Sequence, residues 1–204
     1  MGKETMRKIG LFGGTFNPIH NGHLALAQNA YEQCDLDEVW FIPSGISYMK
    51  KGQNIPSGII RYDMVKEAIK EIQHFKVSDI EISREGNSYT YDTLVQLHTQ
   101  YPEDSFYFII GDDTLFSMET WYKPEEIFRL SQIIVTARDV DKAGICEKKE
   151  ELCHKYGASI LLIEAPVIDI SSTCIREAVS YNKSIAHMVP ESVSKYIYEH
   201  ALYV

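Results

Sequence analysis

An apolar strand, a glycine-rich turn and a helix follow one another near the start of this chain, and this order constrains the fold more than any other feature. The run Ile9–Phe12 is typical of a buried strand, and Gly13–Gly14 follows it directly. Leu24–Ala27 then continues at helical spacing. Glycines let the backbone approach a ligand closely, and the free N–H groups of a helix start favour an anion. The segment therefore predicts a phosphate-binding turn.

Two histidines, His20 and His23, lie where this helix begins. Their spacing places both imidazoles on one side of a helical turn and indicates chemistry on phosphate. Two other interpretations compete with this one. The flanking Asn17-Pro18 and Gly22 disfavour a simple cap or surface role, and a metal site needs further ligands that the local sequence does not supply. The chain carries neither the P-loop pattern nor the dinucleotide-binding fingerprint.

Apolar runs alternate with helical patterns along the chain. This alternation predicts an α/β fold with a doubly wound, mainly parallel, Rossmann-like sheet covered on both faces. Ligands of such sheets lie beyond the carboxyl ends of the strands, which places Gly13–His23 and Gly111–Asp113 on one rim. We expect one domain over residues 1–204, with a C-terminal helical piece over about 171–204 that ends in a closing helix at Pro190–Leu202. The expected strands are Lys8–Phe12, Glu38–Ile42, Phe75–Val77, Phe106–Ile110, Gln132–Thr136 and Ser159–Ile163, and the other expected helices are Leu24–Gln33, Ile59–Ile72, Thr90–Tyr101 and Glu147–Tyr156.

The composition limits which binding partners and which cellular compartment we expect for this protein. The 20 Lys and Arg residues against 29 Asp and Glu give a net charge of −9, which repels nucleic acid and anionic membranes. The N-terminal residues are polar, and the apolar stretch Ala158–Ile170 is interrupted by Glu164 and Asp169, so we expect neither a signal peptide nor a membrane span. The four cysteines form no C-x-x-C pair and indicate reduced thiols in the cytoplasm.

A second helix start with hydroxyl side chains lies near the C-terminal end. Ser171, Ser172 and Thr173 offer hydroxyls together with uncapped backbone N–H groups. Arg176 follows about one turn later, where its guanidinium can reach an oxygen held at that start. An ordinary N-cap followed by a surface arginine is the alternative. Taken with the N-terminal turn, the two sites suit opposite ends of a triphosphate.

With both sites in place, the chain resembles the nicotinate-nucleotide adenylyltransferase family, within the nucleotidyltransferases that carry a T/H-x-G-H signature. The resemblance covers nearly the whole chain. Its most specific parts are the S-Y-T-x-x-T-L pattern at Ser88–Leu94 and the I-S-S-T-x-I-R pattern at Ile170–Arg176. The other matching segments are Gly13–Leu24, Phe108–Asp113 followed by Trp121, and Val189–Tyr203.

The resemblance implies transfer of AMP from ATP to nicotinate mononucleotide, which gives deamido-NAD and pyrophosphate. The nucleophile is already an anionic phosphate, so the protein has to align the reactants and stabilise charge. Mg²⁺ travels with ATP. The resemblance implies catalytic roles for His20, His23 and Arg176, and ATP binding by Gly13, Gly14, Thr15, Phe16, Lys50, Ser171, Ser172 and Thr173. It implies mononucleotide binding by Asp113 and Arg138, by Trp121 against the pyridine ring, and by the backbone amides of Thr90 and Tyr122 at the carboxylate.

One loop departs from the family pattern, because Ser47-Tyr48-Met49-Lys50 stands where the family usually has P-P-H-K. Three alternatives remain at this stage. A sister adenylyltransferase would act on nicotinamide mononucleotide or pantetheine phosphate, a nucleotide-sensing module would be non-catalytic, and a metal hydrolase would use His20, His23 and Asp113. We expect a cytoplasmic enzyme whose partners are ATP and nicotinate mononucleotide, with no nucleic acid or membrane partner; a homo-oligomer is compatible with the sequence.

Overall fold

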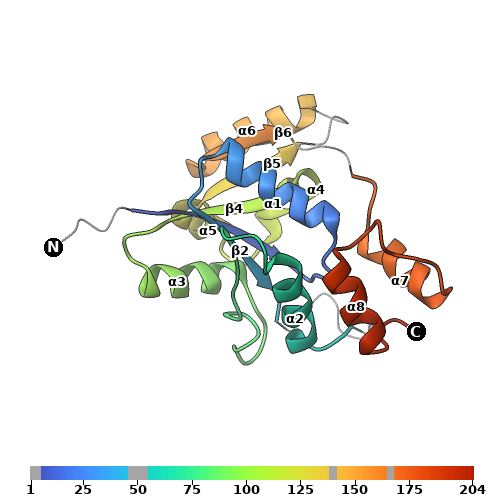
Figure 1. Ribbon diagram of the computed structural model, residues 1–204. Helices are drawn as coiled ribbons and strands as arrows, with labels where there is room; N and C mark the ends of the chain where they lie inside the picture. Colours follow the sequence, from blue (N-terminus) through green and yellow to red (C-terminus); the bar gives the residue numbers. More distant parts are fainter. Residues whose placement is uncertain (1–5, 46–54, 138–141, 165–167) are drawn as a thin grey trace.

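A computed structural model describes residues 6–45, 55–137, 142–164 and 168–204. Among these residues six strands form one parallel sheet in the order β3-β2-β1-β4-β5-β6 (Figure 1). The predicted doubly wound α/β fold is therefore confirmed. The strands are β1 (Lys8–Gly14), β2 (Glu38–Pro43), β3 (Phe75–Val77), β4 (Ser105–Gly111), β5 (Gln132–Ala137) and β6 (Ile160–Glu164). The helices are α1 (Asn21–Gln33), α2 (Gly58–Ile69), α3 (Thr90–Gln100), α4 (Asp112–Leu115), the 3-10 turn η2 (Met118–Thr120), α5 (Pro124–Leu130), α6 (Lys142–Tyr156), α7 (Ser172–Ser180) and α8 (Glu191–Glu199).

The strand order reverses between β1 and β4. β1 pairs with β2 up to Gly14, which lies opposite Pro43, and it pairs with β4 from Lys8, which lies opposite Ser105. The helices that follow these two central strands pack on opposite faces, since α1 contributes to one apolar core and α4 to the other. The connections after β1 and β4 therefore leave the sheet toward opposite faces. A crevice is expected between these two connections, at the carboxyl ends of the strands.

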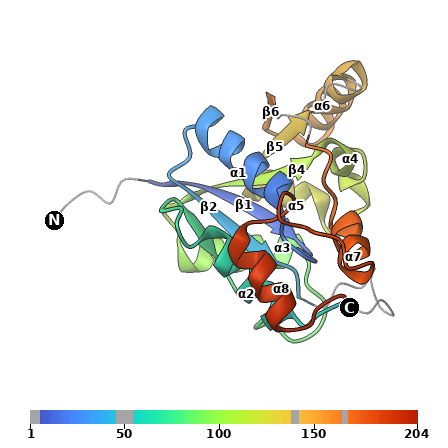
Figure 2. The same ribbon diagram turned by 45° about the vertical axis from the view of Figure 1, so that its right-hand side comes forward.

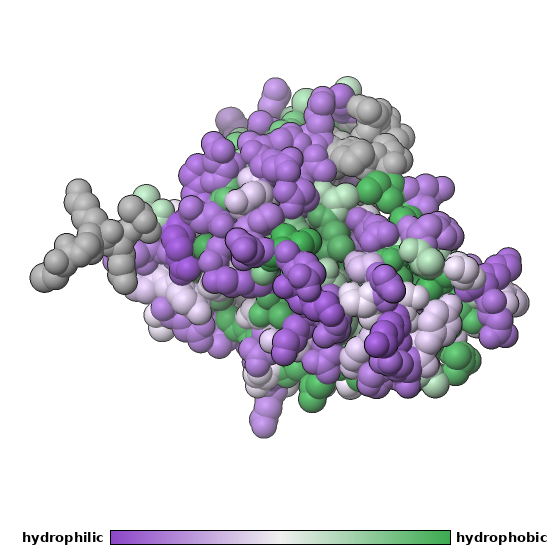
Figure 3. All heavy atoms as spheres, viewed as in Figure 1, coloured by the Kyte–Doolittle hydropathy of each residue, from purple (hydrophilic) through white to green (hydrophobic). Residues whose placement is uncertain are grey.

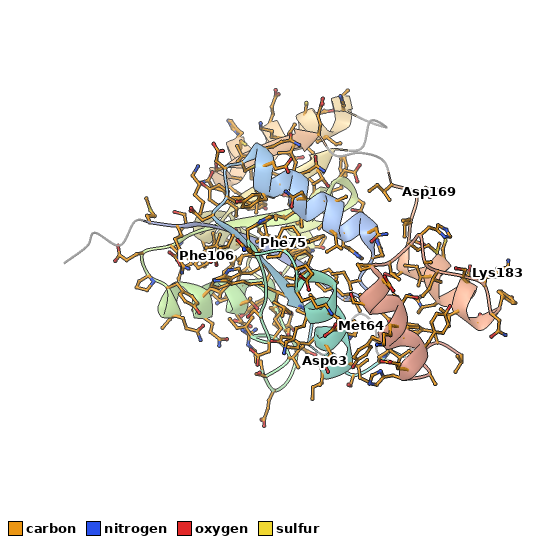
Figure 4. The ribbon with its side chains drawn as sticks, in the orientation of Figure 1. Asp63, Met64, Phe75, Phe106, Asp169 and Lys183 are labelled. Atoms are coloured by element: carbon orange, nitrogen blue, oxygen red, sulfur yellow. The ribbon has the colours of Figure 1, made fainter. Side chains whose placement is uncertain are left out.

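Two apolar cores sandwich the sheet. Side chains alternate along a strand, so Ile9 and Leu11 of β1 join one core while Phe12 joins the other. Helices α1, α2, α7 and α8 cover the Phe12 side, and α3 to α6 cover the opposite side. Figure 4 labels one aromatic residue of each core, Phe75 and Phe106.

The C-terminal segment packs against α2, as the predicted closing helix requires. Figures 1 and 2 both show α8 beside α2. Val193 and Ile197 of α8 are fully buried, and the hydroxyl of Tyr196 donates to Asp63, which Figure 4 labels on α2. The hydroxyl of Ser192 donates to the Glu67 carbonyl at 2.9 Å. Apolar burial and two polar contacts therefore hold the C-terminal segment on the first core.

Several helices differ from the prediction. The chain adds α4, η2 and α5, which are too short to show a periodic pattern, and α2 ends at Ile69 rather than Ile72. Helix α6 begins at Lys142, before the predicted start at Glu147, because burial of Ile145 outweighs the poor helix propensity of Gly144.

The surface agrees with the composition. On the face drawn in Figure 3, hydrophilic residues predominate and apolar ones appear in small separate areas. In the described ranges no helix combines the length and the apolar character that a membrane crossing requires.

Candidate active site

A cavity of about 900 Å³ opens at the switch point of the sheet. Its walls come from both central strands, since Gly13 and Gly14 end β1, Thr15 follows it, and Phe108–Gly111 end β4. The two predicted rim segments are thus brought together at Gly13 and Gly111. The rest of the wall includes Phe12, Ser44, Glu81, Ser88, Tyr89, Thr90, Thr114, Thr120, Trp121, Tyr122, Lys123 and Ile127.

The turn after β1, predicted to bind phosphate, has a shape that its glycine permits. Phe16 adopts a left-handed backbone conformation with φ of 48° and its side chain is only 2% exposed. The ring packs edge-on against Phe12, and a Cβ at Gly14 would lie 2.9 Å from it. Residue 14 must therefore be glycine, and Phe16 shapes the turn from inside the core, so that any contact with a ligand comes from its backbone.

His20 and His23 form a close pair at the start of α1. Their ring centroids are 3.6 Å apart, with 32° between the ring planes, and the ring of Phe16 packs edge-on against His23. The backbone N–H of His20 donates to Nδ1 of His23 at 3.2 Å. A nitrogen that accepts cannot carry the proton, so neutral His23 holds its proton on Nε2.

Both imidazoles are neutral near pH 7. Burial lowers the pKa of His20 from 6.5 to about 4. Burial, and then the neighbouring His20, lower the pKa of His23 well below its usual value. Nδ1 of His20 is buried and has no hydrogen-bond partner among the described residues. The pair can therefore offer N–H donors to a phosphate without carrying charge of its own.

The second predicted phosphate site lies directly against the first. The hydroxyl of Ser172 donates to the Pro18 carbonyl at 2.8 Å, and Nη1 of Arg176 donates to the Asn17 carbonyl at 2.9 Å. Ser171 is the N-cap of α7, because its hydroxyl accepts from the backbone N–H of Cys174. Nη2 of Arg176 donates to Thr173. The start of α7 and the N-terminal turn thus form one continuous surface.

The hydroxyl of Tyr203 also reaches this turn, where it donates to Oδ1 of Asn17 at 2.7 Å. Burial raises the pKa of Tyr203, so the phenol keeps the proton that this bond requires.

Three of the five residues predicted to bind the mononucleotide line the cavity. Thr90 begins α3, Trp121 packs edge-on against Phe108 with centroids 6.0 Å apart, and Tyr122 is 47% exposed. All three predicted residues line the cavity together with Gly13–Thr15.

Asp113 lies beside the cavity and is not one of its lining residues. It is exposed, and its carboxylate accepts from the backbone N–H of Thr114 at 2.9 Å. Lys50 and Arg138 lie outside the described residues. The predicted roles of Asp113 and Arg138 in mononucleotide binding, and of Lys50 in ATP binding, stay predictions.

The sequence interpretation missed three residues of this region. Ser44 and Glu81 line the cavity, and Arg61 lies beneath the turn, where it donates to the Thr15 carbonyl at 2.7 Å. The hydroxyl of Ser44 is buried without a partner in the described part of the chain, which is typical of a group that a ligand satisfies. The Ser44-Gly45 pair, which follows the predicted strand Glu38–Ile42 after a single proline, was the signal that could have indicated this position.

The site was also predicted to lack protein ligands for a metal ion. No three His, Cys, Asp or Glu side chains gather in a way that could hold a metal ion within the described ranges.

Comparison with known proteins adds to this geometry. The sequence profile of the cytidylyltransferase-like family matches residues 11–178. A probable nicotinate-nucleotide adenylyltransferase of Lachnoclostridium phytofermentans is 44% identical over 200 residues, which cover 98% of this chain and 100% of that protein. A protein of the same description from Clostridium perfringens is 41% identical, over 97% of this chain and 98% of its own length. The chain belongs to the nicotinate-nucleotide adenylyltransferase family.

Solved structures share the fold of this adenylyltransferase. The nicotinic acid mononucleotide adenylyltransferase of Plasmodium falciparum, complexed with NaAD, aligns with a TM-score of 0.78 at 21% identity and covers 97% of both chains. A putative nicotinate-nucleotide adenylyltransferase from Vibrio parahaemolyticus aligns with a TM-score of 0.67 at 24% identity, over 97% of this chain and 96% of its own. The enzyme is thus a nucleotidyltransferase of NAD biosynthesis with a Rossmann-like fold.

Proposed function

We propose that this adenylyltransferase binds ATP at the phosphate-binding turn and nicotinate mononucleotide in the switch-point cavity, and joins them into deamido-NAD with release of pyrophosphate. One observation supports these binding positions for the two substrates. The same cavity of about 900 Å³ is lined by Gly13–Thr15 and by Thr90, Trp121 and Tyr122. Two substrates bound in one cavity can bring their phosphates together at Gly13–Thr15.

In the proposed reaction a phosphate oxygen of the mononucleotide forms a bond to the α-phosphorus of ATP. The bond between that phosphorus and the α–β bridging oxygen breaks, and the electron pair leaves with pyrophosphate. The Nε2–H of His23 donates to a phosphate oxygen on which charge builds, a role for which the neutral, oriented tautomer is suited. His20 donates beside it.

The start of α7 holds the leaving phosphates in this proposal. Ser171, Ser172, Thr173 and Arg176 adjoin the turn through the contacts to Asn17 and Pro18, which places their donors next to the β- and γ-phosphates. Mg²⁺ enters as part of MgATP, coordinated by phosphate oxygens and water.

Selectivity for the nicotinate carboxylate has two sources in the cavity wall. The backbone amides of Thr90 and Tyr122 are donors, and a wall of donors leaves the NH₂ of a nicotinamide without an acceptor. Lys123 adds a cation: its ammonium lies 4.2 Å from the ring centroid of Tyr91, and no carboxylate of the described residues forms an ion pair with it. A negatively charged ring substituent is therefore favoured.

The test is pyrophosphate release by the purified protein with MgATP and one of four acceptor conditions: nicotinate mononucleotide, nicotinamide mononucleotide, pantetheine phosphate or none. We expect release with the nicotinate form and much less with the nicotinamide form. Equal release with both would contradict the assigned carboxylate contacts, and release with pantetheine phosphate alone would identify a sister enzyme. A single domain over 1–204, a cytoplasmic location and a homo-oligomer stay predictions, which sedimentation and cell fractionation can test.

A further inference from the structure

The peptide unit between Ser44 and Gly45, directly after β2, is held on both sides by charged side chains. The Ser44 carbonyl accepts a hydrogen bond of 2.6 Å from Nη2 of Arg61. The N–H of Gly45, in the same peptide unit, interacts with the carboxylate of Glu81 and lowers the pKa of that carboxylate. The peptide dipole thus points its oxygen at a cation and its N–H at an anion, which is the orientation that both charges stabilise.

Arg61 directs its guanidinium at the backbone alone. It is 4% exposed, and besides Ser44 it donates to the carbonyl of Thr15 at 2.7 Å and to that of Pro56 at 3.2 Å. No carboxylate of the described residues lies within ion-pair distance of it. Burial of a cation without an ion-pair partner costs free energy, so these three bonds must be needed to hold the site together. They connect the phosphate-binding turn to the residues on either side of segment 46–54.

Glu81 belongs to a network on the cavity wall. Its carboxylate accepts from the hydroxyl of Thr93 at 2.9 Å, and that hydroxyl also accepts from Nη1 of Arg84 at 3.2 Å. Burial raises the pKa of Glu81, and the bonds from Thr93 and Gly45, with the charge of Arg84, oppose this rise. Glu81 therefore has its partners fixed before any substrate binds.

The packing at Gly45 leaves the peptide no freedom to shift. A Cβ on this residue would lie 2.4 Å from the carbonyl oxygen of Glu81 and 2.6 Å from Oγ of Ser88. Ser44 lines the cavity, and its unpartnered hydroxyl is buried next to the same peptide. The position of this peptide therefore decides where that hydroxyl meets a ligand.

We propose that Arg61 and Glu81 are positioning residues that fix the Ser44–Gly45 peptide, and that this peptide couples the phosphate-binding turn to the mononucleotide cavity. The inference rests on the places proposed above for the two substrates. Arg61 acts through Thr15 on the ATP side, and Glu81 acts through Gly45 on the mononucleotide side. Because Arg61 and Glu81 hold the same rigid peptide, loss of either side chain should weaken the binding of both substrates.

The experiment compares Arg61→Lys, Glu81→Gln and the double variant with Arg129→Lys, an exposed arginine on α5 that serves as the matched control. Binding of nicotinate mononucleotide and of an ATP analogue with a non-cleavable α–β link is measured separately by calorimetry, together with kcat, both KM values and the melting temperature. We expect each single variant to weaken both ligands by about 10-fold, and the double variant to be little worse than the worse single one.

A merely structural role would lower the melting temperature and leave binding by the folded protein unchanged, and this result would overturn the proposal. A loss of ligand affinity of about 100-fold in the double variant would also overturn the proposal, because the free-energy effects of independent sites add. Thr93→Val removes one donor to Glu81 and provides a milder variant if Arg61→Lys does not fold; we expect both ligands to weaken about threefold. If the wild-type protein fails to bind nicotinate mononucleotide, the proposed function is wrong, while the ATP-analogue measurements still decide the role of Arg61.

Discussion

We expect replacement of His20 by asparagine to change how the free energy of unfolding depends on pH. Burial lowers the pKa of His20 from 6.5 to about 4, and the side chain is 7% exposed. Between these two pH values the unfolded chain binds a proton at His20 that the folded protein does not bind. The stability that neutral His20 contributes is therefore complete above pH 6.5 and is lost as the pH falls towards 4. The slope is about 1.4 kcal/mol per pH unit, or roughly 3 kcal/mol over the whole window.

The assay is urea unfolding of the wild-type protein and of His20→Asn at pH 7.5, 6.5, 5.5 and 4.5. The difference in unfolding free energy between the two proteins should move by about 2.5 kcal/mol in favour of the variant between pH 7.5 and 4.5, because the lowest pH lies above the folded pKa of about 4. His154→Asn, at an exposed histidine of α6, controls for the general effect of removing an imidazole. If the wild-type and His20→Asn curves stay parallel, His20 titrates alike in both states and the argument from its burial is refuted.

Three further predictions concern chemistry, selectivity and stability. His23→Ala should lower kcat by about 10²- to 10³-fold while the Kd for ATP changes little, because the hydrogen bond that His23 donates strengthens in the transition state. Steady-state kinetics and calorimetry of ATP binding test this, and an unchanged kcat would contradict it. Lys123→Met should raise the KM for nicotinate mononucleotide by about 2- to 5-fold without changing the KM for nicotinamide mononucleotide. An equal change in both KM values would mean that the Lys123 ammonium does not interact with the nicotinate carboxylate. Ile197→Ala, in the fully buried face of α8, should cost about 2–5 kcal/mol in urea unfolding, against less than about 0.5 kcal/mol for the exposed neighbour Tyr198→Ala.

The sheet and the turn between β1 and α1 could be predicted from the sequence because their signals are local. β3 was predicted with its observed bounds, and β1 differs from the prediction only by its last two residues, Gly13 and Gly14. A buried parallel strand is a short continuous apolar run, so the residues that form it also identify it. The helix start at Ser172 was likewise predicted, since its capping hydroxyl precedes it directly.

The residues that hold the site together could not be predicted in this way. Arg61 occurs within an amphipathic helix, where an arginine usually faces solvent, and its three acceptors are contributed by distant parts of the chain. Glu81 follows a three-residue strand in a polar loop. Helix α5 has only seven residues, too few for periodicity to show. Such features depend on contacts between segments, and a pattern within one segment does not contain them.

The central position of β1 also has a consequence for folding. β1 joins β2 through the crossover that contains α1. Its pairing with β4 instead brings together Arg7 and Asp104, which are 97 residues apart and share a hydrogen bond of 3.1 Å. Closing a loop of that length costs roughly 4 kcal/mol of chain entropy, only about 1 kcal/mol more than closing the β1–β2 loop. Each half of the sheet carries one wall of the cavity, so recovery of catalytic activity during refolding reports when the longest-range pairing of the central strands is complete.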